Sequence, residues 1–337
     1  MDIIAVLFLA GLVVGYFVLA GCDIGLGMLM PYLARTPADR RRVVSAIAPY
    51  FLGTEVWLVG AVGVVAGLFP ALKSELTTGL GPVLVMLPAG WVARDAGLWF
   101  RARVASRAWH ALWDTAITVG SWVLALSLGL AVGGMLNGGS LLSPFAVACA
   151  FTVAALFALR GAAFGAERLV PAGGSPAFGT AEAPASAAPG ATLVAERTAS
   201  AVNTAENADV AAQATRVIAR VALAGAAVSV LAAAVAGGTA VERLPTAAVI
   251  VSVLAAVLAG TAGLSGPRLS RHTSAVAVAV PPLLVAAAVE LPIAAAPTGT
   301  LTLVGFALAP VVPVMLIGQV WLYRMLRRPA PVSGFFA

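Results

Sequence analysis

The chain has 337 residues, of which 61% are hydrophobic and 10% are charged. Soluble globular domains carry about 25% charged residues, so this composition excludes an ordinary soluble fold and predicts an integral membrane protein. The formal net charge is +6, but no basic cluster is interleaved with aromatic side chains. We therefore expect membrane lipid, and no nucleic acid, among the partners of the chain.

Apolar runs of 18 or more residues are typical of membrane-spanning helices, and by this rule the chain has about nine spans. The first run is too long for the core of a signal peptide and lacks a small-residue cleavage site, so we predict a retained helix. The pattern predicts an all-α fold, arranged as two four-helix bundles plus one extra helix. The predicted spans are 3–33, 44–71, 78–99, 109–135, 143–164, 216–237, 246–264, 273–293 and 301–325.

Arginines fall in alternate loops, and Lys and Arg in short loops stay on the cytoplasmic side of a membrane. The loops that follow odd-numbered spans contain Arg35, Arg40, Arg41, Arg42, Arg101, Arg103, Arg107, Arg168, Arg197, Arg216, Arg220, Arg268, Arg271, Arg324, Arg327 and Arg328. The other loops contain only Lys73 and Arg243. We therefore predict a multi-pass protein of the plasma membrane, with its N-terminus outside and its C-terminus in the cytoplasm.

The chain divides into three predicted parts. Residues 1–136 form a first four-helix bundle, residues 137–296 a second helix group, and residues 297–337 the last span and a cytoplasmic tail. Within the second part, residues 166–215 are rich in Ala, Gly, Pro, Ser and Thr, which indicates a flexible cytoplasmic loop. The end of this loop, residues 192–215, could form a short surface helix.

Three carboxylates lie where the membrane disfavours charge. A carboxylate at the bilayer centre costs roughly 2.5–3.5 kcal/mol, so such residues face a partner or a water-filled path. Glu55 is the deepest, and Pro49 predicts a break in the same helix. Asp23 and Asp114 lie nearer the arginine-rich side. We predict that Glu55, Asp23 and Asp114 form a proton pathway, and that Trp57 contacts a quinone or a partner.

Each of these acids has a plainer interpretation. Glu55 could be fixed by a hydrogen bond, and Asp23 and Asp114 could pair with the arginines near them. Arg94 and Asp95 are adjacent, and snorkelling of the long side chain with local pairing would explain both. Glu290 is expected at the membrane interface on the outer side.

Residues that ligate metals are scarce. The only histidines, His110 and His272, stand at separate helix starts, and Cys22 and Cys149 form no paired motif. A buried haem needs axial ligands that converge at one depth. We expect that this chain ligates no haem and no metal.

Several motifs resemble those of subunit II of the cytochrome bd-type quinol oxidases. In chain order they are Gly21-Cys22-Asp23-Ile24-Gly25-Leu26-Gly27, Arg40-Arg41-Arg42, Ile47-Ala48-Pro49, Glu55-Val56-Trp57-Leu58, Phe100-Arg101, Trp113-Asp114 and Gln319-Val320-Trp321-Leu322-Tyr323. The match is strong over residues 1–140, weak in the middle and fair at the end. The chain departs from the family where acids are usual, at Ala20, Leu52 and Trp99.

The resemblance implies a two-subunit enzyme that oxidises quinol and reduces oxygen to water. Haems b and d and the quinol site would belong to the partner, subunit I. This chain would be the haem-free subunit II, which supports subunit I and offers a cytoplasmic proton path. Two alternatives stay open at this point. The chain could be a proton-coupled secondary transporter with Glu55 as the coupling acid, or a purely structural assembly subunit.

Overall fold

The computed structural model describes residues 2–170, 190–236, 239–264, 266–294 and 296–325. Within these ranges the chain is all-helical, apart from one isolated bridge between Val241 and Val289. Eight described helices are long and apolar enough to cross a membrane, and a ninth span results if the two parts of one bent helix are counted together. The prediction of an all-α membrane protein with about nine spans is therefore confirmed.

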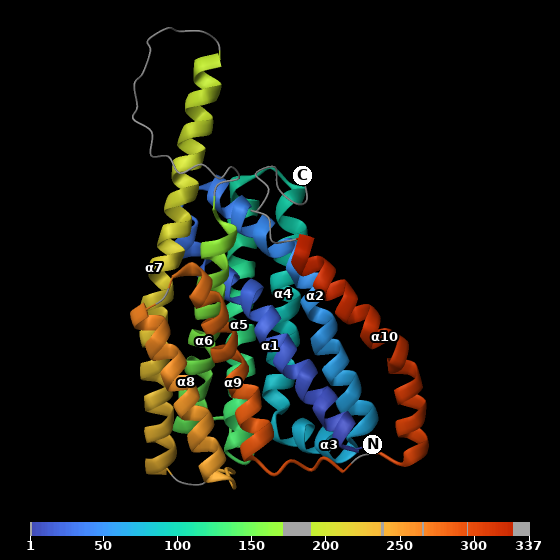
Figure 1. Ribbon diagram of the computed structural model, residues 1–337. Coiled ribbons are helices and arrows are strands. Elements are labelled where there is room, and N and C mark those ends of the chain that lie inside the picture. The colour runs from blue at the N-terminus through green and yellow to red at the C-terminus, as the bar shows by residue number, and fades with distance from the viewer. Residues whose placement is uncertain (1, 171–189, 237–238, 265, 295, 326–337) are drawn as a thin grey trace.

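Figure 1 shows the helices standing side by side as a tall bundle. In chain order they are α1 (Asp2–Leu33), α2 (Pro37–Leu68), α3 (Pro70–Gly79), α4 (Gly81–Phe100), the 3-10 turn η1 (Arg101–Arg103), α5 (Arg107–Leu136), α6 (Pro144–Arg168), α7 (Gly190–Ala236), α8 (Leu244–Leu264), α9 (Pro267–Ala288) and α10 (Thr298–Met325). Each predicted span corresponds to one long helix. The short helix α3 was not predicted.

The start and the bend of α2 follow from its sequence. Thr36 caps the helix: its hydroxyl accepts a hydrogen bond from the backbone N–H of Asp39, whose side chain in turn accepts one from the backbone N–H of Thr36. Pro37 fills the first turn, where the missing N–H is harmless. The parts Pro37–Phe51 and Gly53–Leu68 meet at an angle of 41°. Pro49 lies just before this bend and removes a helix hydrogen bond, as expected for a proline kink.

The long helix α7 corrects the predicted loop at 166–215: residues 192–215, which the sequence allowed as a short surface helix, are helical but belong to this longer helix. Residues 166–168 belong to α6, and residues 190–215 form the first half of α7, which continues without a break into the sixth span. The reason is compositional, because no Gly or Pro interrupts the Ala-rich run between Gly190 and Gly225, and alanine has the highest helix propensity. Residues 171–189 lie outside the described part. In Figure 1, α7 projects beyond the bundle.

Small residues allow the central helices to touch. A Cβ atom added to Gly25 on α1 would lie 1.9 Å from the carbonyl oxygen of Phe157 on α6, and one added to Gly161 would lie 2.0 Å from the carbonyl carbon of Gly25. Gly129 of α5 lies against the backbone of Ala150 in the same way. Close backbone approach of this kind is a common mode of packing in membranes.

The helix packing does not separate cleanly at residue 136. Helix α1 packs along α2, α5, α6 and α9, and α5 also packs along α6. The division into two four-helix bundles stays a prediction. Helix α10 packs mainly against α2, and Figure 1 shows it diverging from the rest.

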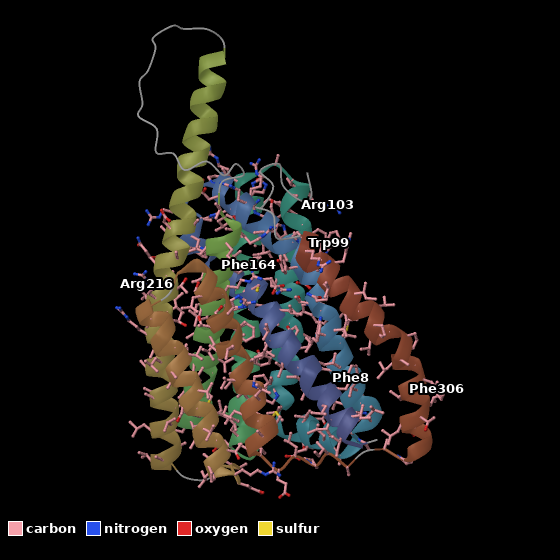
Figure 2. The ribbon with its side chains drawn as sticks, viewed as in Figure 1. Phe8, Trp99, Arg103, Phe164, Arg216 and Phe306 are labelled. Atoms are coloured by element: carbon pink, nitrogen blue, oxygen red, sulfur yellow. The ribbon has the colours of Figure 1, made fainter. Side chains whose placement is uncertain are left out.

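The arginine-rich loops gather at one end of the bundle, which we call the basic end. It contains the end of α1, the α4–α5 turn and the end of α6 (Figure 1). Figure 2 shows Trp99 and Arg103 toward this end, with Phe8 and Phe306 in the other half. The loops therefore alternate as predicted. The side of the membrane on which the basic end lies stays a prediction.

Candidate functional site

Four charged side chains from three helices meet inside the bundle, and we call them the Arg94 cluster: Asp23 of α1, Glu55 of α2, and Arg94 and Asp95 of α4. The Arg94 side chain is only 3% exposed. Its guanidinium contacts all three carboxylates, at 3.3 Å from Nη1 to Asp23, 3.5 Å from Nη2 to Glu55 and 3.0 Å from Nη2 to Asp95. Local pairing with Asp95 occurs as expected, but Arg94 does not snorkel, because its guanidinium is buried.

Asp23 is completely buried and receives only hydrogen-bond donors. Its Oδ1 accepts from the backbone N–H of Ile24 at 2.9 Å. Its Oδ2 accepts from Arg94 at 3.3 Å and from the Thr54 hydroxyl at 3.4 Å. Donors and an opposite charge favour an ionised carboxylate. Asp23 and Arg94 therefore form a buried ion pair.

Glu55 and Asp95 lie at the edge of the cluster. Each side chain is 18% exposed, whereas that of Asp23 is 0% exposed. The indole N–H of Trp91 donates to Oε1 of Glu55 at 2.8 Å. The cluster thus extends from a sealed ion pair to two carboxyl groups that reach the surface of α2 and α4.

Close packing of α5 against α4 fixes the position of Arg94. A Cβ atom added to Gly120 would lie 2.7 Å from the backbone nitrogen of Arg94 and 2.9 Å from its Cβ atom. A Cβ atom added to Gly90 would meet the carbonyl oxygen of Gly120 at 3.1 Å. Because α4 and α5 touch here without intervening side chains, the guanidinium points toward α1 and α2.

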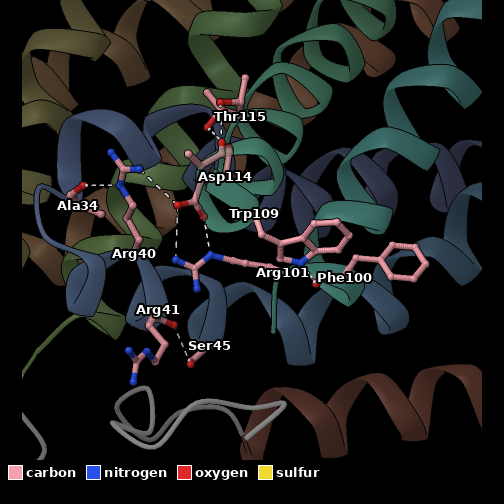
Figure 3. A network of polar contacts seen from close by, with 11 residues as sticks. Ala34, Arg40, Arg41, Ser45, Phe100, Arg101, Trp109, Asp114 and Thr115 are labelled. Atoms are coloured by element: carbon pink, nitrogen blue, oxygen red, sulfur yellow. Dashed lines mark hydrogen bonds and ion pairs between the residues drawn. The ribbon is translucent and has the colours of Figure 1, made fainter. Parts of the chain in front are cut away.

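Asp114 belongs to a second network at the basic end, shown in Figure 3. Its carboxylate accepts hydrogen bonds from Nε and Nη2 of Arg101, the latter at 3.4 Å. It also accepts one from Arg40 Nη1 at 3.3 Å. The structure therefore brings Asp23 and Glu55 together through Arg94 and leaves Asp114 apart from them.

Trp57 faces the chain's own helices. Its ring lies against Gly15 of α1, where an added Cβ atom would overlap it at 2.2 Å. Its indole N–H donates to Gln319 of α10 at 3.4 Å. Contact with a quinone or a partner stays a prediction for this residue.

Arg160 of α6 is buried within a span, although no role was predicted for it from the sequence. Its guanidinium donates to the backbone oxygen of Val18 at 3.2 Å, to that of Arg271 at 2.7 Å, and to the Ser274 hydroxyl at 3.3 Å. These acceptors lie on α1 and α9, so one side chain links three helices. A lone Arg in an apolar span was the signal that could have revealed it.

The described residues contain no group of three His, Cys, Asp or Glu side chains that could hold a metal ion. His110 stands near the start of α5 and His272 on α9. That this chain ligates no haem and no metal stays a prediction, and no chemical step is assigned to a haem on it.

Taken together, the spans and the buried charges define a multi-pass membrane protein that keeps a network of ionisable groups inside its bundle. Membrane proteins retain such groups mainly for proton or ion pathways or for contact with a partner. The sequence profile of the cytochrome bd terminal oxidase subunit II family matches residues 1–326. The chain belongs to this family.

Individual relatives align over a smaller region. The chain is 32% identical over 127 residues to cytochrome bd-I ubiquinol oxidase subunit 2 of Escherichia coli (strain K12), which covers 38% of this chain and 34% of that protein. It is 30% identical over 168 residues to a probable cytochrome oxidase subunit 2 of Haemophilus influenzae, covering 45% and 44%. For cytochrome bd ubiquinol oxidase subunit 2 of Bacillus subtilis (strain 168), the identity is 30% over 128 residues, covering 38% and 36%. The aligned region spans less than half the length of these relatives.

Proposed function

We propose that this chain is the haem-free subunit II of a bd-type quinol:oxygen oxidoreductase in the plasma membrane. It packs against a haem-bearing subunit I, which carries haems b and d and oxidises quinol. The family match supports this assignment, and it favours an oxidase subunit over the secondary transporter that the sequence left open. The N-terminus lies outside and the C-terminus in the cytoplasm, as the arginine distribution indicates.

The chain also offers a proton path from the cytoplasm toward the site of oxygen reduction. The observation that supports this role is the Arg94 cluster, since three carboxylates share one buried guanidinium within the spans. Asp114 would lie nearest the cytoplasmic mouth and Asp23 and Glu55 deeper. A group that only tied helices together would not need the excess of acids over bases.

One family acid is absent on α4, at Trp99, and Asp95 stands four residues before that position. Residues four apart share one face of a helix. Asp95 therefore lies about one turn from the place where the family usually has an acid. Glu55 stands within the motif Glu55-Val56-Trp57-Leu58, which resembles that of the family. This spacing supports a proton role for Asp95 beside Glu55.

The first test is isolation of the tagged chain from membranes of its own cells. A haem-bearing second subunit should co-purify and the complex should consume oxygen with quinol.

The second test is Glu55→Gln, which keeps the shape and hydrogen bonding of the side chain but removes its proton. Turnover and proton uptake should fall while the haem content stays unchanged. Glu75→Gln, on an exposed residue of α3, is the matched control.

Two results would contradict the proposal. If the purified chain carries no haem-bearing partner, the oxidase assignment fails. If Glu55→Gln supports full oxygen consumption with normal charge movement across the membrane, Glu55 is a structural residue. The chain then acts as a purely structural assembly subunit.

A further inference from the structure

The Arg94 cluster contains more acids than its surroundings can neutralise. Asp23, Glu55 and Asp95 would contribute three negative charges, and Arg94 contributes one positive charge. Among the described residues the other titratable group facing the cluster is the phenol of Tyr16 on α1, which is 4% exposed. An uncompensated charge buried away from water is strongly disfavoured, so the cluster must bind protons to approach neutrality.

The contacts indicate which oxygens hold the proton. Asp23 receives three donors and is already paired with Arg94. Glu55 and Asp95 meet at one nitrogen, because Nη2 of Arg94 lies 3.5 Å from Oε1 of Glu55 and 3.0 Å from Oδ1 of Asp95. Oε2 of Glu55 and Oδ2 of Asp95 receive no hydrogen bond from the described part of the chain. Two carboxyl groups can bond to each other only if one of them carries a proton, because an ionised carboxylate has no donor.

This pair also has access to the exterior of the chain. A shallow cavity of about 420 Å³ lies along α4. It is lined by Trp91, Val92, Asp95, Ala96, Trp99 and Phe100. Asp95 forms part of its wall, and Trp91 holds Glu55 beside it. A group from outside the chain can therefore reach this pair, whereas Asp23 is sealed.

We propose that Glu55 and Asp95 share one proton as a carboxyl pair on the α2–α4 surface, and that this pair exchanges protons with groups outside the chain. Asp95 thereby becomes part of the site, although no sequence motif marks it. The use of the shared proton in turnover rests on the proposed function. The sharing itself depends only on the charges and contacts of the cluster.

Infrared difference spectroscopy of the purified complex tests the proposal. A protonated carboxyl gives a C=O stretching band that an ionised carboxylate lacks, and this band shifts to lower frequency in D₂O. We expect the band in the unaltered protein, with a D₂O shift that develops without unfolding. Glu55→Gln should remove it, and Asp95→Asn should change its frequency, because the hydrogen-bonding partner of the remaining carboxyl is different. Asp114→Asn is the control and should leave the band in place.

The outcomes separate the two proposals. If the unaltered protein lacks the band, or if the band survives in both Glu55→Gln and Asp95→Asn, the shared proton is excluded whatever the turnover. If the band fails to shift in D₂O, exchange with the exterior is excluded. If the band behaves as expected but Glu55→Gln turns over normally, the carboxyl pair stands and the proton path of the proposed function falls.

Discussion

Gly25 of α1 and Gly161 of α6 lie in direct backbone contact. A Cβ atom on Gly161 would approach the nitrogen of Leu26 to 2.2 Å, and one on Gly25 would approach the nitrogen of Gly161 to 2.7 Å. Asp23 stands only two residues before this crossing. The spacing of α1 and α6 therefore also sets the position of the buried carboxylate that pairs with Arg94.

Gly25→Ala should separate α1 from α6. Overpacking a well-filled interior costs roughly 1–3 kcal/mol, and here the obstacle is backbone, which cannot rotate aside. We expect a lower melting temperature of the purified complex and reduced turnover. Gly11→Ala on the same helix is the matched control, because nothing lies within 4 Å of its added Cβ atom. Equal melting temperatures for the two variants would show that the crossing tolerates a methyl group.

Arg94→Gln should destabilise the chain more than any single acid substitution in the cluster. Removing one partner of a buried ion pair costs roughly 3–5 kcal/mol, because the other charge is left uncompensated. Asp23→Asn in the same chain should restore much of the loss, since it removes the stranded charge. A double-mutant cycle on thermal unfolding measures this coupling. Additive losses from the two substitutions would refute the ion pair.

Arg160→Lys should fail to replace arginine. The guanidinium reaches acceptors on α1 and α9 at once, and the compact lysine ammonium lacks this planar fork. Each hydrogen bond to a charged donor contributes about 1.5–3 kcal/mol, so Arg160→Lys and Arg160→Met should both lower the yield of folded protein. Arg103→Met, on an exposed arginine, should not. A normal yield and melting temperature for Arg160→Lys would mean that charge alone suffices.

The end opposite the basic end should respond to pH through Glu242. A hydrogen bond with Glu290 raises the pKa of Glu242 above its ordinary value. Between the ordinary pKa of Glu242 in the unfolded chain and its raised pKa in the folded chain, the folded chain binds more protons. The stability of the folded chain therefore falls as pH rises through the raised pKa. Hydrogen exchange at the amides of Ala240 and Glu242, which donate to Leu136 and Ala288, should quicken there beyond its intrinsic pH dependence.

Glu290→Gln is the check on this pH response. It keeps a hydrogen-bonding partner for Glu242 and removes the second carboxyl group, so the extra pH dependence should shrink. An unchanged profile in Glu290→Gln would place its origin elsewhere.

The spans were predictable because hydropathy alone selects them, and in a membrane every backbone group must be satisfied within a helix. The sequence also marked Asp23 and Glu55, since acids in apolar runs are conspicuous. It did not reveal that Arg94 joins them, because the pairing depends on how α1, α2 and α4 face each other. Because Asp95 follows Arg94 directly in the sequence, pairing between these two residues was enough to explain both.

The sequence placed Asp114 toward the arginine-rich side and left pairing with an arginine open as its plainer interpretation. The structure shows this pairing, with Arg40 and Arg101 at the basic end. A helix at 192–215 was allowed from the sequence, but its continuation into the sixth span was not, because these residues were grouped with a Pro- and Gly-rich neighbour. A composition averaged over residues 166–215 mixes the two parts, whereas helix formation depends on the residues in each part.

The attachment of α10 has a consequence for how the chain is built. This helix is synthesised after all the other described spans. The segment that leads into it is held by a hydrogen bond from the Ala296 N–H to the Leu68 carbonyl, and the helix packs mainly on α2. Every residue of the Arg94 cluster precedes residue 100. The charged interior can therefore assemble during translation, before α10 arrives to cover Trp57 and the outer side of α2.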